Sequence, residues 1–116
     1  MKPIEKKCFR LVQEIVCERD GVCQRCGKMP ISGHHFFGRR NHSTCFDPQG
    51  MLGLCVECHA WAHSYPEMAR ELLRSLVGDE CYTWLEALSR TVCRLKEGDF
   101  RLIAERLRKQ LEGMKG

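Results

Sequence analysis

The sequence predicts a small α+β fold, in which a short two-stranded hairpin and a helix follow one N-terminal helix and precede about three more helices. Three observations predict it. Apolar residues recur with helical spacing at the start of the chain and through its second half. A short aromatic stretch, "ISGHHFF", lies between turn-rich segments, and two CxxC pairs flank it. The 116 residues are expected to form a single domain over residues 1–116, with a core at 23–63 and a helical extension at 64–116.

The N-terminal helix is predicted to begin near Pro3, a residue suited to the first turn, and to end at "RDG", residues 19–21. Its apolar face consists of Cys8, Leu11, Val12, Ile15 and Val16. "ISGHHFF" and "MLGL" are expected to be strands, joined by the polar loop "GRRNHSTCFDPQG". "CVECHAWAH" then reads as a turn that enters a helix.

The extension at 64–116 is predicted to contain three helices. "SYPE" resembles a capping box with Ser64 as the N-cap, Gly78 should end that helix, and Asp79 should cap the next. Gly98 and Asp99 repeat this stop and start. The expected apolar positions are Met68, Leu72, Leu73 and Leu76 on the first helix, Trp84, Leu85, Leu88, Val92 and Leu95 on the second, and Phe100, Ile103, Leu107 and Leu111 on the third.

The composition limits the cellular setting and the class of partner. No apolar run is long enough to cross a membrane, and the N-terminus does not resemble a signal peptide, so a cytoplasmic protein without membrane attachment is expected. A net charge of +4 permits a nucleic-acid partner without requiring one. Nine cysteines is an odd count, which disfavours a pure disulfide framework.

Two of the cysteine pairs have the spacing of metal ligands. Cys23 with Cys26, and Cys55 with Cys58, supply four thiolates, which is a tetrahedral set for a structural Zn²⁺. Gly27 favours the sharp turn after the first pair. The alternative is that these are buried cysteines packed as small apolar side chains. Of the remaining cysteines, Cys8, Cys81 and Cys93 are expected in helix cores.

Four of the five histidines fall on the elements that zinc would hold together. His34 and His35 lie on the first predicted strand, and His59 and His63 lie four residues apart on the helix, so that they share one face. Because strand side chains alternate, only one of His34 and His35 should point at the helix, and the two rings should have different roles. A second, functional metal site is therefore expected. The alternative is that one or two rings join the zinc site or hydrogen-bond the loop.

The combination "CQRCG … HHFFGRRN … LCVECHAWAH" resembles the zinc-containing HNH endonucleases, which have the ββα-metal fold. It is most similar to the short enzymes of that family found in phages and prophages, some of which nick DNA. The resemblance covers about a third of the chain, residues 23–63. It implies a bacterial or phage-encoded enzyme that hydrolyses DNA phosphodiester bonds to leave 5′-phosphate and 3′-hydroxyl ends.

The resemblance also assigns roles to individual residues. His35 would be the general base, and His34, His59 and His63 would ligate one divalent cation. The family's middle asparagine has no clear counterpart in "DPQGMLGL": Asn41 or Gln49 would supply the amide, or no residue does. Imidazole ligands suit Mn²⁺, Ni²⁺, Co²⁺ or Zn²⁺ better than Mg²⁺, so stronger activity is expected with Mn²⁺ than with Mg²⁺.

Other side chains suggest how DNA is held. Arg39 and Arg40, in the loop over the histidines, are expected to contact backbone phosphate, and the basic last helix is a weaker candidate. Phe36, Phe37, Phe46 and Trp61 are expected in the core and not as base-stacking platforms. A monomer carries one site, which favours nicking; both strands would be cut by a homodimer or by successive events. Two non-catalytic alternatives remain, a zinc-stapled nucleic-acid-binding module and a zinc-dependent protein-interaction domain.

Overall fold

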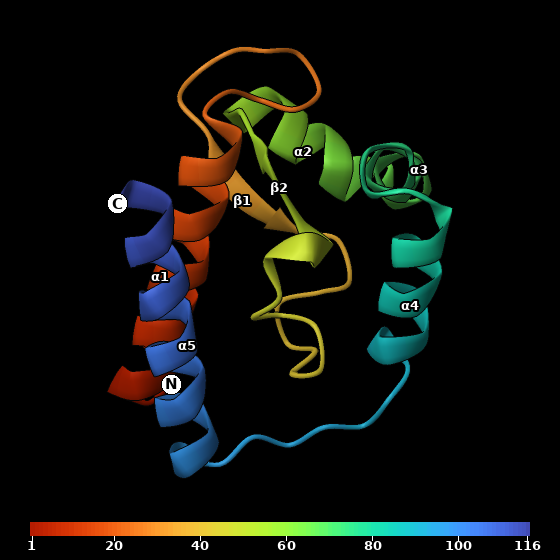
Figure 1. Cartoon of the computed structure of the whole chain (residues 1–116). Helices are drawn as coiled ribbons and strands as arrows, with labels where there is room; N and C mark the ends of the chain where they lie inside the picture. Colours follow the sequence, from red (N-terminus) through yellow and green to blue (C-terminus); the bar gives the residue numbers. More distant parts are fainter.

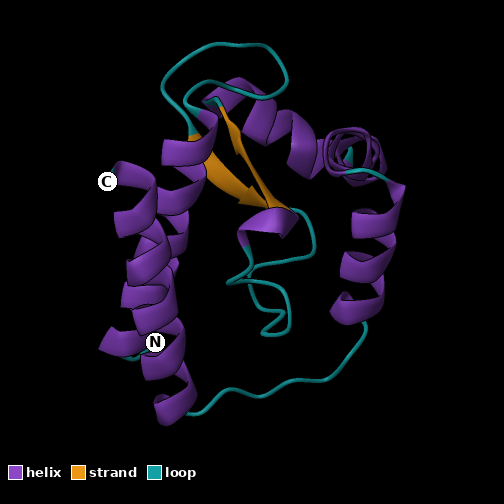
Figure 2. Cartoon of the chain, in the orientation of Figure 1, coloured by secondary structure: helices purple, strands orange, loops and turns teal.

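The computed structural model describes all 116 residues and has the predicted order of elements. Five α-helices surround a single two-stranded sheet (Figures 1 and 2). The elements are α1 (Pro3–Asp20), β1 (Ser32–His35), the short 3-10 helix η1 (Pro48–Gly50), β2 (Met51–Leu54), α2 (Val56–Ser64), α3 (Pro66–Val77), α4 (Asp79–Ser89) and α5 (Glu97–Lys115). No helix is both long enough and apolar enough to cross a membrane.

The two strands pair antiparallel, with Ser32 opposite Leu54 and His35 opposite Met51. Their side chains alternate between two helical neighbours. Gly33 is hydrogen-bonded to the Gln13 side chain on α1, whereas the ring of His34 packs against that of His59 on α2. The hairpin therefore has one face toward α1 and one toward α2, and consecutive residues of β1 face different helices.

Two apolar clusters cover these two faces. The first joins α1 and α5, which lie side by side in Figure 1, to Met51 and the end of the long loop. Its members from α1 and α5 confirm the apolar positions predicted for both helices, with Ile103 only partly buried against the cluster. The second joins the hairpin to α2, α3 and α4 around Leu54, Leu73 and Leu85. The hairpin therefore lies between two helical layers, and each layer buries one of its faces.

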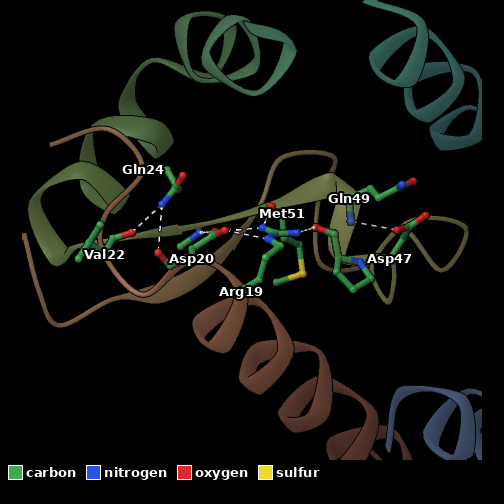
Figure 3. Close-up of polar contacts among 9 residues, drawn as sticks. Arg19, Asp20, Val22, Gln24, Asp47, Gln49 and Met51 are labelled. Carbon is green, nitrogen blue, oxygen red and sulfur yellow. Dashed lines mark hydrogen bonds and ion pairs between the residues drawn. The ribbon is translucent and has the colours of Figure 1, made fainter. Parts of the chain in front are cut away.

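The end of α1 is tied to the second strand by a polar network (Figure 3). Gly21 ends the helix with a φ of 71°, a backbone conformation that favours glycine. The Arg19 guanidinium donates to the carbonyl oxygens of Pro48 and Met51, each at 2.7 Å, and pairs with Asp20. Asp20 in turn accepts from the backbone N–H of Gly53 at 2.7 Å. These contacts fix the C-terminal end of α1 relative to η1 and β2.

The predicted limits of the later helices are partly wrong. Ser64 is the last residue of α2 and not the N-cap of α3, because the Tyr65 N–H still donates to Trp61 O. Tyr65 is the N-cap of α3, and its side chain makes no capping hydrogen bond. Asp79 is the first residue of α4 and not its cap. Gly98 lies inside α5, while Asp99 accepts from the Lys96 N–H and does mark that helix start.

The apolar pattern also overestimates how much of α3 and α4 is buried. α4 ends at Ser89, so Val92 and Leu95 lie beyond it in the connection to α5, and Val92 is 92% exposed. Met68, Leu76 and Trp84 are exposed on the outer surface of their helices. Both helices pack through one narrow line of residues that includes Ala69, Leu73 and Leu85.

The predicted burial of the cysteines and of the aromatic side chains is only partly confirmed. Cys8 is buried in the core as predicted, but Cys81 is only half-buried and Cys93 is exposed in the connection before α5. Phe36, Phe37 and Phe46 are buried. Trp61 is partly buried against the second cluster.

Candidate metal centres and the histidine cavity

The two CxxC pairs converge on one point. The sulfur atoms of Cys23, Cys26, Cys55 and Cys58 all lie within 4.8 Å of one another, and those of Cys26 and Cys55 are 3.5 Å apart. Four thiolates around one Zn²⁺ at about 2.3 Å would be separated by roughly 3.8 Å. The donor set and its spacing therefore fit a structural metal such as zinc.

Backbone hydrogen bonds shape this cluster. Gly27, with a φ of 81°, donates to Cys23 O at 2.8 Å and closes the knuckle between the first pair. Gln24 N donates to Gly53 O at 3.0 Å, which attaches the knuckle to β2. Cys55 is the N-cap of α2 and Cys58 is in its first turn. The second pair thus lies at a helix N-terminus, where thiolate charge is favoured.

The thiols differ in their acidity. Burial works to raise the pKa of Cys23, but hydrogen bonds from the backbone of Cys55, Cys26 and Arg25 outweigh it and lower that pKa to about 6. The Arg25 side chain lies over the Trp61 ring at 3.8 Å and donates to Cys58 Sγ at 3.5 Å. A cation beside the sulfur atoms offsets part of the negative charge that four thiolates would carry.

The histidines form a second cluster, on the α2 side of the hairpin. Nitrogen atoms of His34, His59 and His63 lie within 4.8 Å of one another, and this grouping is compatible with a metal ion. The His34 ring stands edge-on to the other two, with ring centroids 4.7 Å and 4.9 Å away, and the rings of His59 and His63 stack at 5.1 Å. The sequence prediction that these three residues share one site is consistent with this geometry.

His34 is held in its neutral form. The residue is 6% exposed, and burial, followed by the nearby His59 and His63, lowers its pKa to about 4. Burial and His63 also lower the pKa of His59. Neutral imidazoles present lone pairs, which is the form that binds a metal ion.

A hydroxyl group orients one of these rings. His59 Nδ1 lies 3.3 Å from Ser32 Oγ, two residues before His34 on the same strand. When Nδ1–H donates to this oxygen, Nε2 keeps its lone pair. Hydrogen bonding of the second ring nitrogen is the usual support for a histidine ligand.

His35 lies on the other face of the hairpin, as strand alternation predicts. Its Nε2 is 3.1 Å from Cys45 O, and its ring packs edge-on against Phe9 of α1 at 5.9 Å. Burial lowers the pKa of His35, and the positive charge of Arg39 adds to this, although the contact with Cys45 O works in the opposite direction. With Nε2–H donating to the carbonyl, Nδ1 is the nitrogen that can accept a proton.

One cavity of about 700 Å³ connects the two sets of histidines. His34, His35, His59 and His63 all line it, so residues that face different helices still reach a common space. The cavity lining also includes Arg39 and three residues of α1, namely Lys6, Arg10 and Gln13. Of these, Lys6, Arg10 and Arg39 are exposed and form the cationic border of the cavity. No aspartate or glutamate lines the cavity. Sequence reasoning did not identify the α1 residues; their spacing on one helix face was the available signal, but the hairpin contact is needed to show where that face points.

The two arginines of the loop differ. Arg39 lines the cavity, with its guanidinium 4.5 Å above the Phe9 ring. Arg40 is exposed and does not line the cavity. Of the pair, Arg39 is therefore the residue placed beside the histidines.

Neither candidate for the middle asparagine reaches the histidines. The Asn41 side chain donates to Ser89 O at 2.6 Å and accepts from the Ser43 hydroxyl at 2.5 Å, so it joins the loop to the end of α4. Gln49 is exposed and lines a separate hollow with Arg19 and Asp47; Figure 3 shows these three side chains near the start of β2. Its backbone N–H donates to the Asp47 carboxylate at 2.9 Å. The amide of the predicted motif is thus not supplied to the cavity by either residue.

Comparison with known proteins adds no assignment: no family model, no curated protein and no solved structure matches this chain.

Proposed function

We propose that this protein is a metal-dependent endonuclease with an HNH, or ββα-metal, core that hydrolyses phosphodiester bonds of DNA and nicks one strand at a time. One observation carries the proposal: His35, with one ring nitrogen anchored on Cys45 O, shares a cavity with the three clustered histidines. An anchored neutral imidazole and a group of nitrogen ligands are the two parts that metal-assisted phosphodiester hydrolysis needs.

In this proposal His35 acts on water. Its neutral Nδ1 accepts a proton while the water oxygen bonds to phosphorus. The bond between phosphorus and the 3′-oxygen breaks, the 5′-phosphate stays on one fragment, and the 3′-oxygen takes a proton from solvent. Cys45 O holds the ring, so that little reorientation is needed at the moment of transfer.

His34, His59 and His63 would hold the divalent cation, which when bound stabilises negative charge on the phosphate and on the departing oxygen. Arg39, which lines the same cavity, would contact a non-bridging phosphate oxygen. The four-cysteine cluster would take no part in the reaction. Its role is to hold the knuckle and the start of α2 against the strands, which fixes the histidines in relation to each other.

A non-catalytic DNA-binding module is the second candidate. It is favoured by the positions of Asn41 and Gln49, which leave the cavity without the middle amide of the motif. This candidate keeps the zinc cluster and the cationic border of the cavity but assigns no proton transfer to His35.

An assay on supercoiled plasmid distinguishes the endonuclease from the binding module. We expect the wild-type protein with Mn²⁺ to convert it to open circles, and EDTA or His35→Ala to prevent the conversion. His42→Ala is the matched control, because His42 accepts from the Leu95 N–H outside the cavity and is the only histidine that does not line it. Intact plasmid with Mn²⁺, Mg²⁺ and Zn²⁺, from protein that binds DNA, would establish the binding module instead.

A further inference from the structure

The cationic border of the histidine cavity comes largely from the first helix. Lys6 and Arg10 are four residues apart on α1, so they share a helix face, and both are exposed at the cavity border. Arg39 reaches the same border from the loop and stacks on Phe9, which lies between Lys6 and Arg10 on that helix. Three positive charges from two segments therefore meet at one opening.

These charges are not neutralised by the protein. None of Lys6, Arg10 and Arg39 is among the residues that form ion pairs. The acidic residues of α1, which are Glu5, Glu14, Glu18 and Asp20, lie outside the cavity lining. An opening with unpaired cations and no carboxylate favours a polyanion.

The other basic surfaces are different. On α5, Arg108 pairs with Glu112 at 2.7 Å, and Lys109 pairs with Glu105 at 3.3 Å. On α3, Arg70 donates to Phe36 O and faces a hollow lined by Glu67, Glu71 and Glu86. Arg108 and Lys109 are therefore already paired, and Arg70 lies among carboxylates. Arg101 and Arg106 of α5 form no ion pair, but they do not line the histidine cavity.

The border is also fixed in position. The Gln13 side chain accepts from Gly33 N at 2.7 Å and donates to Gly33 O at 2.8 Å, which ties α1 to the residue just before His34. A β-carbon on Gly33 would lie 2.8 Å from Met51 Cε and 3.1 Å from Gln13 Oε1, so a larger residue there would require these two side chains to shift. The cations on α1 are thus held at a set distance from the histidines.

We propose that Lys6, Arg10 and Arg39 form a binding rim for the backbone phosphates of duplex DNA, and that α1 is the element that guides a strand into the histidine cavity. The proposal rests on the proposed function for the identity of the polyanion. It assigns Lys6 and Arg10 to phosphates flanking the one that is cut, so their effect should be on binding and not on the chemical step.

The test is a salt titration of binding to a fluorescent 20-base-pair duplex, measured by anisotropy without added divalent metal, so that no cleavage occurs. Lys6→Gln with Arg10→Gln should weaken binding roughly tenfold or more at low salt and reduce the slope of log K against log salt by about two. Arg108→Gln with Lys109→Gln removes the same charge from α5 and should change the slope little. Circular dichroism and zinc content show whether each variant is folded.

The outcomes separate this proposal from the nuclease assignment. Equal effects of the two double variants, or an unchanged slope for the α1 variant, would overturn the rim even if the wild type nicks plasmid. A reduced slope specific to the α1 variant would support the rim even if no plasmid is nicked, and the nuclease assignment alone would then fall. Absence of any duplex binding by the wild type would overturn both.

Discussion

His35 Nε2 lies 3.1 Å from the carbonyl oxygen of Cys45, at the far end of the loop that joins the two strands. This contact assigns the ring proton to Nε2 and leaves Nδ1 as the acceptor. It also links the proposed base to a loop whose other contacts lie at the end of α4, through Asn41, and in the connection before α5, through His42. The tautomer of one ring is therefore controlled by the packing of a long connection.

The nicking rate should fall at acidic pH only below the ordinary histidine pKa of 6.5, because burial lowers the pKa of His35. A base with a lowered pKa stays neutral and competent as the pH falls past 6.5, and activity is lost only as the pH passes through the folded-state value. Rates at saturating Mn²⁺ from pH 4.5 to 8 measure this. A fall in rate at or above pH 6.5 would contradict the assignment of His35, provided that Mn²⁺ is shown to remain bound over that range.

Asn41→Ala should destabilise the protein without removing activity. The change leaves Ser89 O without its partner and removes one of the two acceptors of the Ser43 hydroxyl, which keeps Leu88 O, at a cost of about 1–3 kcal/mol. Thermal melting measures the loss, and nicking is assayed well below the melting temperature. A variant with unaltered melting and no nicking would instead make Asn41 the missing asparagine of the motif.

Removal of one cysteine of the zinc cluster should abolish folding and not only metal content. Cys23→Ser is expected to lower bound zinc from one per chain to none and to release the knuckle from β2, since structural zinc contributes folding free energy directly. Metal analysis and circular dichroism check this. Cys93→Ser is the matched control, because that thiol is exposed and outside both clusters. Full zinc content in Cys23→Ser would refute the four-cysteine site.

Nicking should be faster with Mn²⁺ than with Mg²⁺, because the three proposed ligands are imidazoles and Mg²⁺ prefers oxygen. His63→Ala should weaken Mn²⁺ activation, seen as a higher Mn²⁺ concentration for half-maximal rate. A clear preference for Mg²⁺ in the wild type would argue against a ligand set of three histidines.

Much of the fold could be predicted from local pattern. Helical periodicity identifies α1 and α5, strand alternation separates the directions of His34 and His35, and the i, i+4 spacing on α2 places His59 beside His63. These features depend on residues close in sequence. The spacing of the two CxxC pairs extends the prediction to one long-range contact, because four thiolates have a single common geometry.

The features that could not be predicted depend on distant partners. α4 ends at Ser89 where Asn41 and Ser43 from the strand-connecting loop take the carbonyl oxygens of Ser89 and Leu88, and no nearby residue signals this. The position of Arg10 at the cavity likewise depends on the Gln13 contact with Gly33. Both contacts join segments that lie 20 or more residues apart.

The packing of α1 against α5 affects how the protein folds during its synthesis. The buried face of α1 is completed mainly by Phe100, Leu107 and Leu111, which are made long after α1 itself. A ribosome-bound chain that lacks α5 would leave this face exposed to water, and contacts between such distant segments form slowly. The cysteine knuckle and the hairpin can assemble earlier, but the apolar face of α1 is not fully covered until α5 has been made. In newly made chains, α1 would then reach its native packing only once α5 has been translated.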